Sequence, residues 1–146
     1  MMFITADQAY NIAQSFISTK DATIEKCVSA RYYTHYTLTV NNLRLDIDAP
    51  HGGPGFDWLD DYNYNGSITL YKNGSTIMFH GTKHTVGRAM NKSKYNPIRI
   101  ATRMLSPKFF KIIDLAEDRI QNRIIPLGRI QNLEKTIHNI AQQKHR

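Results

Sequence analysis

Two hairpin signals constrain most strongly what this chain can fold into. Each signal is a pair of alternating apolar and polar runs joined by a two-residue turn, "YTLTV-NN-LRLDID" and "SITLYK-NG-STIMFH". The turn residues, Asn41-Asn42 and Asn73-Gly74, tolerate the positive φ angles that such turns require. The chain is therefore expected to form a four-stranded antiparallel sheet from two hairpins.

A two-residue turn also sets the register, and the predicted register sorts the side chains onto two faces. In the first hairpin the apolar face is expected to pair Val40 with Leu43, Leu38 with Leu45, and Tyr36 with Ile47. Its polar face is expected to pair Thr39 with Arg44, Thr37 with Asp46, and His35 with Asp48. In the second hairpin the expected pairs are Leu70–Ile77, Ile68–Phe79, Tyr71–Thr76, Thr69–Met78 and Ser67–His80.

Helices are expected on both sides of the sheet region in the sequence. "TADQ", beginning at Thr5, has the spacing of a capping box and precedes an apolar face at helical spacing. Asn96-Pro97 and Ser106-Pro107 predict two further helix starts, because proline favours the first helical position. A last helix carries a short apolar seam that docks on the domain or supports a homodimer: Ile130, Leu133, Ile137 and Ile140.

These elements predict one α+β domain over residues 1–146, with the C-terminal helices packed on one face of the sheet. The expected divisions are a helix at 1–20, the two-hairpin sheet at 22–80 with a long loop at 50–65, and a basic helical region at 85–146. No apolar run is long enough for a membrane span, and the single cysteine, Cys27, indicates a reducing compartment. We therefore expect a cytoplasmic protein without a membrane partner, with Cys27 as a small core residue.

Charge is divided unevenly along the chain. Residues 1–61 hold four Lys or Arg and eight Asp or Glu, whereas residues 62–146 hold fifteen and four. Between Asp61 and Asp114 lie 52 residues with nine Lys or Arg and no carboxylate. Such asymmetry is typical of a chain with a polyanionic partner.

The basic stretch suggests how a nucleic acid would be held. Long cations on one surface, beside a histidine and an aromatic side chain, suit phosphate contact and base stacking. The predicted contact residues are Lys83, His84, Arg88, Lys92, Lys94, Tyr95, Arg99 and Arg103. Known DNA- or RNA-reading motifs are not evident, so DNA and RNA both remain open.

A second hypothesis is a protein-targeting inhibitor or adaptor of a nucleoprotein machine, as phages and mobile elements encode. The loop at 50–65 combines glycines, carboxylates and aromatic side chains, and loops of this length in compact domains often carry function. Its expected protein contacts are Phe56, Trp58, Tyr62 and Tyr64.

A third hypothesis is a hydrolase on the polar sheet face. His35-Tyr36-Thr37 and His80-Gly81-Thr82 resemble the paired His-x-Thr/Ser signatures of the two-histidine phosphoesterases. The resemblance implies that two imidazoles face each other across a groove and act as general acid and base, with His35, Thr37, His80 and Thr82 as the site. A metal site on the same face would use His35, Asp46, Asp48 and His80, which suit Zn²⁺ or Mn²⁺. No known metal-binding or nucleophile motif occurs, so we expect no cofactor and favour binding over catalysis.

Overall fold

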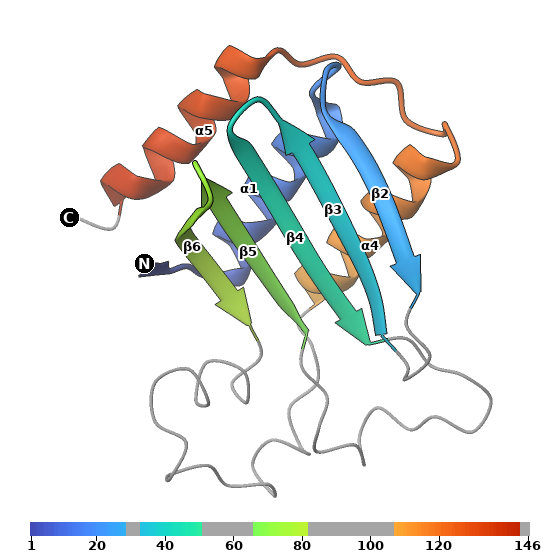
Figure 1. Cartoon of the computed structure of the whole chain (residues 1–146), viewed down its shortest axis with the longest axis horizontal. Helices are drawn as coiled ribbons and strands as arrows, with labels where there is room; N and C mark the ends of the chain where they lie inside the picture. The colour runs from blue at the N-terminus through green and yellow to red at the C-terminus, as the bar shows by residue number, and fades with distance from the viewer. Residues whose placement is uncertain (29–32, 51–65, 82–106, 144–146) are drawn as a thin grey trace, which may run out of the picture.

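A computed structural model describes residues 1–28, 33–50, 66–81 and 107–143 of the chain. This part is an α+β fold in which helices cover one face of a mixed six-stranded sheet (Figure 1). The strands are β1 (Met2–Phe3), β2 (Thr23–Val28), β3 (Tyr33–Val40), β4 (Leu43–Pro50), β5 (Ser67–Lys72) and β6 (Ser75–Gly81). The described helices are α1 (Ala6–Ser18), α4 (Pro107–Ile120) and α5 (Ile130–Gln143). The sheet order is β1-β6-β5-β4-β3-β2, so the expected four-stranded sheet forms its centre.

The first helix begins as its sequence predicts. Thr5 caps α1: its hydroxyl accepts a bond from the Gln8 backbone N–H at 3.2 Å, and the Gln8 side chain accepts from the Thr5 N–H at 2.9 Å. This reciprocal pair satisfies two amides that a helix start would otherwise leave unbonded. The apolar face of α1 is fully buried, with Ala9, Ile12, Ala13, Phe16 and Ile17 against the sheet and the other helices.

The first hairpin has the predicted register throughout, from Val40–Leu43 at the turn to His35–Asp48 near the other end. Asn41 takes the positive φ of 52° that the turn needs. The helix-facing side chains of β3 and β4 are almost completely buried, including Tyr36, Leu38, Leu45 and Ile47. The hairpin therefore provides the centre of the core.

The predicted register of the second hairpin is wrong beyond its first pairs. Tyr71 lies opposite Thr76 as expected, but a bulge between Leu70 and Tyr71 places Leu70 opposite Met78 and leaves Ile77 as an extra residue. The shift also pairs Thr69 with Phe79, Ile68 with His80, and Ser67 with Gly81. A one-residue slip moves every later side chain to the other face of the sheet. His80 therefore shares the helix-covered face with Ile68, and Phe79 turns to the open face.

Two strands extend the sheet beyond the predicted hairpins. β2 pairs antiparallel with β3 at one edge, and Cys27 on it is exposed rather than part of the core. β1 pairs in parallel with β6 at the other edge through two residues, Met2 and Phe3. The Phe3 and Phe79 rings meet edge to face with centroids 5.9 Å apart. This contact gives the short β1 strand a fixed place at the end of the sheet.

A polar contact fastens α4 to the sheet. Glu117 accepts a hydrogen bond from the buried Tyr36 hydroxyl, and its carboxylate lies 2.7 Å from the Lys26 ammonium on β2. Burial and the Glu117 carboxylate raise the pKa of Tyr36. Burial alone would raise the pKa of Glu117, but Lys26 and Tyr36 together lower it. The phenol thus stays neutral and the carboxylate stays charged over the ordinary pH range.

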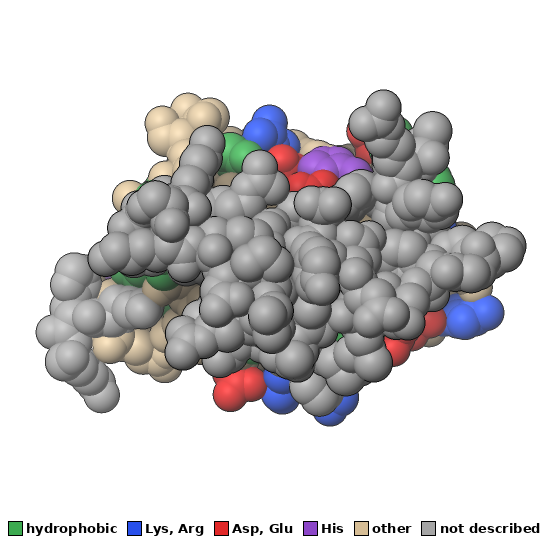
Figure 2. Space-filling model, turned by 90° about the horizontal axis from the view of Figure 1, so that it is seen from below, with side chains coloured by type: hydrophobic (Ala, Val, Ile, Leu, Met, Phe, Trp, Pro, Cys, Tyr) green, Lys and Arg blue, Asp and Glu red, His purple; other side chains and the backbone are tan. Residues whose placement is uncertain are grey.

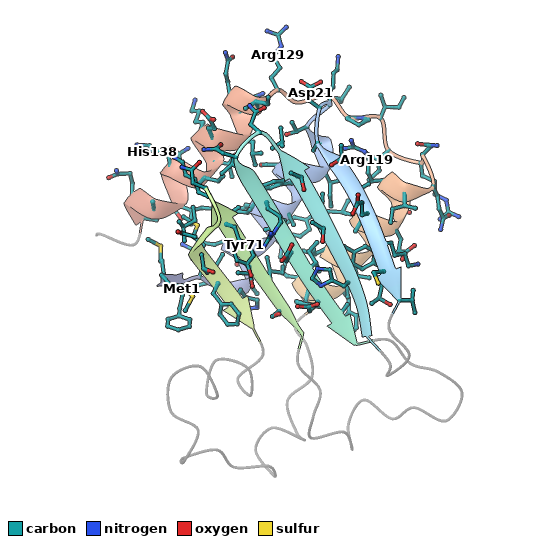
Figure 3. The ribbon with its side chains drawn as sticks, in the orientation of Figure 1. Met1, Asp21, Tyr71, Arg119, Arg129 and His138 are labelled. Carbon is teal, nitrogen blue, oxygen red and sulfur yellow. The ribbon has the colours of Figure 1, made fainter. Side chains whose placement is uncertain are left out.

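Arg119, near the end of α4, binds the end of α1 (Figure 3). Its guanidinium donates to three backbone carbonyls, those of Ile17, Thr19 and Ala22. The Thr19 and Ala22 bonds measure 3.3 and 2.7 Å, and burial lowers the pKa of the guanidinium. The last carbonyls of a helix have no partner within the helix, so the guanidinium supplies a donor to Ile17, and its bonds to Thr19 and Ala22 hold the turn that follows α1.

The apolar seam of α5 lies inside the fold. Leu133 and Ile140 are 0% and 3% exposed, while Ile130 and Ile137 are half-buried against the same core. α5 packs on α1, where the Ser15 hydroxyl donates to Thr136 at 3.1 Å. The seam was predicted either to dock on the domain or to support a homodimer, and in this chain it docks on the domain. No described helix is both long and apolar enough to cross a membrane.

Candidate functional site

The ends of several strands meet at one end of the sheet, and the chain leaves and re-enters the described part there (Figure 1). The register places Tyr33 opposite Pro50, and Ser67 opposite Gly81. The loop after Pro50 therefore returns to the sheet at Gly66, next to the point where the basic segment leaves β6 at Gly81, and Pro50 lies at the same end on the far side of β5. We call this end of the molecule the attachment end.

Most of the binding residues predicted from the sequence lie outside the described residues. They are Lys83, His84, Arg88, Lys92, Lys94, Tyr95, Arg99 and Arg103 of the basic stretch, Phe56, Trp58, Tyr62 and Tyr64 of the loop, and Thr82. The predicted helix starts at Asn96-Pro97 and Ser106 lie there too, whereas Pro107 begins α4. The structure shows where the loop and the basic stretch join the sheet and α4, and the contacts of the residues within them stay predictions.

A cluster of charged side chains on the open face of the sheet lies next to the attachment end. His35 Nδ1 bonds Asp48 Oδ1, and His35 Nε2 lies 3.9 Å from Asp46 Oδ1. Arg44 Nε lies 3.3 Å from the same Asp46 oxygen, and the Arg44 guanidinium stacks 4.0 Å above the Tyr71 ring. Seen from the attachment end, a histidine side chain lies directly beside acidic side chains (Figure 2). The predicted pair His35–Asp48 thus belongs to one network that continues through Asp46 and Arg44 to Tyr71, across β3, β4 and β5.

Local geometry explains why this network holds together. His35, Asp46 and Asp48 alternate with core residues on two paired strands, so their side chains rise from the same face. The Asp46 side chain is only 14% exposed. Its Oδ1 is buried and has ion-pair neighbours at 3.3 and 3.9 Å but no partner in hydrogen-bond geometry. Charge attraction from the Arg44 guanidinium therefore compensates the burial of this oxygen.

The network holds His35 between two carboxylates of β4. Its Nδ1 bonds Asp48, whereas its Nε2 lies 3.9 Å from Asp46, beyond hydrogen-bond distance. Cys27 lies directly across from His35 on β2, although its sequence predicted a core position. Within the described residues, no group of three or more His, Cys, Asp or Glu side chains is arranged to hold a metal ion.

His35 and His80 are not brought together. The bulge in the second hairpin places His80 on the helix-covered face, where its Nδ1 lies 3.0 Å from the Ile4 carbonyl oxygen. Burial lowers the pKa of His80, partly offset by that hydrogen bond. His35 stands on the opposite face with Asp48. The two imidazoles that a phosphoesterase groove would require on one side are thus separated by the sheet, and the proposed metal set is divided in the same way.

The open face also has the wrong charge for a polyanion. Its described charged side chains, apart from His35, are Glu25, Asp46 and Asp48 against Arg44. Near the start of α4, Lys108 is engaged by Asp7 at 3.9 Å and by the Tyr10 ring at 4.8 Å, while Lys111 is exposed. The negative side chains of the open face repel phosphate, so this face is a poor surface for nucleic acid.

Comparisons with protein-family models, with curated proteins and with solved structures found nothing that matches this chain. Its function is therefore argued from its own residues.

Proposed function

We propose that the protein binds a nucleic acid through the basic stretch at 82–106 and acts as an accessory protein without catalytic activity. The observation that carries the proposal is the run of 52 residues with nine Lys or Arg and no carboxylate, which contains this stretch. Each phosphate that a Lys or Arg neutralises releases counterions, and this release favours binding. A carboxylate nearby would repel the phosphate. The proposal names the polyanion class and leaves DNA and RNA as alternatives.

The fold supports this proposal through the points where the stretch is attached. It leaves β6 at Gly81 and re-enters at Pro107, so both of its ends are fixed to well-packed elements. The stretch ends at the amino end of α4, which carries the partial positive charge of a helix start. The acidic open face makes the basic stretch, rather than the sheet, the proposed surface.

The test measures affinity and its salt dependence by fluorescence anisotropy with labelled duplex DNA, single-stranded DNA and single-stranded RNA. Two variants reverse charge in the stretch, Arg88→Glu with Lys92→Glu, and Arg99→Glu with Arg103→Glu. Each pair should weaken binding at least tenfold and lower the salt slope on duplex DNA by about two units. Stability should stay within about 0.5 kcal/mol, because the proposed contacts require these cations to be at the surface, where a charge contributes little to folding.

A matched control reverses two exposed cations outside the stretch, Lys20→Glu with Lys135→Glu, which changes the net charge equally. His35→Ala serves as a second control on the open face. Both controls should bind within about twofold of the parent, because neither removes a proposed phosphate contact. Binding that does not depend on salt, or full binding by both charge-reversed pairs, would overturn the proposal.

The second candidate is a protein-targeting inhibitor or adaptor. The observation that favours it is the attachment of the acidic aromatic loop at Pro50 and Gly66, beside the start of the basic stretch. A partner could then contact both segments at one end of the molecule. Trp58→Ala together with Phe56→Ala should weaken association with such a partner, and the complex should survive nuclease treatment.

A further inference from the structure

The connector between α4 and α5 presents an unusual row of side chains. From residue 123 to residue 130, exposed and half-buried positions alternate without exception. Ile124 and Ile130 turn inward and pack against the core. The outward positions are Arg123, Ile125, Leu127 and Arg129, which we call the connector row.

The two aliphatic members of the row are open to solvent. Ile125 is 78% and Leu127 is 79% exposed, more than any other large hydrophobic side chain in the described residues. Single exposed aliphatics are ordinary on a protein surface, but two that share one side of an extended segment form a continuous apolar patch. In extended backbone their Cα atoms are roughly 7 Å apart.

The connector is held firmly, so this exposure is part of the fold. The Gly128 N–H donates to the Ser18 carbonyl at 2.7 Å, and the Gly128 carbonyl accepts from the Lys20 N–H at 3.2 Å. A Cβ at position 128 would lie 3.2 Å from the Ser18 oxygen, so this close approach favours glycine. At the other end, the Arg123 N–H donates to the Asp118 carbonyl at 2.8 Å. Fixed backbone at both ends means that a partner would have little chain entropy to remove.

Charge at the two ends of the row indicates what kind of surface it fits. The Arg123 side chain is 67% exposed, and Arg129 is exposed near Asp21 (Figure 3). The connector that carries both arginines runs along the end of the molecule opposite to the attachment end (Figure 1). An apolar centre between two arginines suits a protein interface, because the buried core of an interface is apolar and arginine is enriched there.

We infer that the connector row docks into an apolar groove of another protein, with carboxylates at both ends of the groove. Ile125 and Leu127 occupy the groove, and Arg123 and Arg129 pair with the carboxylates. This docking surface is independent of nucleic-acid binding, because it lies at the other end of the fold and uses different cations. Together the two ends would let the protein join a nucleic acid to a protein partner.

Other occupants fit the row less well. In a symmetric pair of two copies with antiparallel rows, Arg123 would face the partner's Arg129, and like charges would repel. A membrane surface would accept the aliphatics, but the cations near the row are balanced in part by Asp118 and Asp21. Stable attachment to anionic lipid generally needs a larger apolar face or a polybasic patch.

The test uses the full chain with a photo-cross-linking amino acid in place of Leu127, added to nuclease-treated extract of cells that produce the protein. The cross-linked protein is identified, purified and titrated by calorimetry against the unmodified chain. Ile125→Ser with Leu127→Ser should weaken binding about 30-fold, and Arg123→Glu with Arg129→Glu about tenfold. Reversing the facing carboxylates of the partner should restore binding to the arginine-reversed variant. The control Val28→Ser, at an aliphatic that is 58% exposed on β2, should bind like the parent.

Three results would overturn the inference. One is the absence of a cross-linked protein, or a partner that binds all variants equally. Another is binding only to vesicles of phosphatidylserine and phosphatidylcholine in a one-to-three ratio, lost when Ile125 and Leu127 are replaced. The third is concentration-dependent self-association in sedimentation runs that the same replacements abolish. Because the nucleic-acid test uses other residues, its outcome is separate from this one.

Discussion

Replacing Arg119 with methionine tests whether its contact with the end of α1 is a main source of stability. Methionine retains the apolar stem of the side chain but removes the guanidinium donors to the carbonyls of Ile17, Thr19 and Ala22, of which Thr19 keeps a bond from the Ala22 N–H. A hydrogen bond from a charged donor contributes about 1.5–3 kcal/mol, and a buried carbonyl without a partner costs a further amount. Three bonds share one guanidinium and part of the site is open to water, so we expect a loss of about 3 kcal/mol.

The assay is urea unfolding followed by far-ultraviolet circular dichroism, with thermal unfolding alongside it. A loss of about 3 kcal/mol should lower Tm by about 10 °C in a domain of this size. The Tm of Arg119→Lys should lie between those of the parent and Arg119→Met, because one ammonium group cannot span three separate carbonyls. The slope of the urea transition should not change, since the compactness of the folded state is the same.

Arg123→Met is the matched control, because this arginine follows in the connector just after α4, is 67% exposed, and pairs with Asp118 only at 3.5 Å. Its loss should cost less than about 0.5 kcal/mol, as expected for an exposed ion pair. If the two methionine variants were equally stable, the three-carbonyl contact would not contribute as argued. Equal and large losses in both would instead show that the whole connector, rather than Arg119, determines the stability of this end.

Two further predictions concern the core. Burial lowers the pKa of His80 below 6.5, so below pH 6.5 the unfolded chain binds more protons; stability should therefore rise as the pH increases through about 6.5. His80→Gln should remove this rise in stability, whereas the control His138→Gln, at an exposed site of α5, should keep it. A urea midpoint of the parent protein that is constant between pH 5 and 8 would contradict the prediction. Leu133 is fully buried, so Leu133→Ala should cost about 3 kcal/mol and Leu133→Asp should prevent folding. A folded, soluble Leu133→Asp monomer in light scattering and circular dichroism would show that the seam serves another copy.

The parts of the fold that local chemistry determines were predictable from the sequence. The capping box at Thr5 and the first hairpin have the predicted geometry, because turn residues and alternation act over a few positions. The second hairpin shows the limit of this reasoning: "NG" fixes the pairs beside the turn, and the bulge after Leu70 arises from packing that alternation does not encode. That single residue moved His80 to the other face and separated the two histidine motifs.

Long-range contacts were the least predictable. The two-residue strand β1 is too short to give a pattern, and its parallel pairing with β6 joins positions 76 residues apart in the chain. The three carbonyls that Arg119 binds are defined by how α4 crosses the end of α1, which no local signal describes. The connector row left no sequence signal, because "RIIPLGR" has two adjacent isoleucines and its alternation of exposed and half-buried positions depends on how the segment packs.

The place of β1 has a consequence for how the sheet avoids pairing with strands of other chains in concentrated solution. Unpaired strand edges are templates for aggregation, and proteins protect them with charges or with short covering strands. The β2 edge carries Glu25 and Lys26, whereas β6 has the apolar sequence "STIMFHG" and relies on Met2 and Phe3 to cover part of its edge. The first residues of the chain therefore act as a guard against strand exchange. Affinity tags and fusions are better placed at the other terminus, which leaves this guard undisturbed.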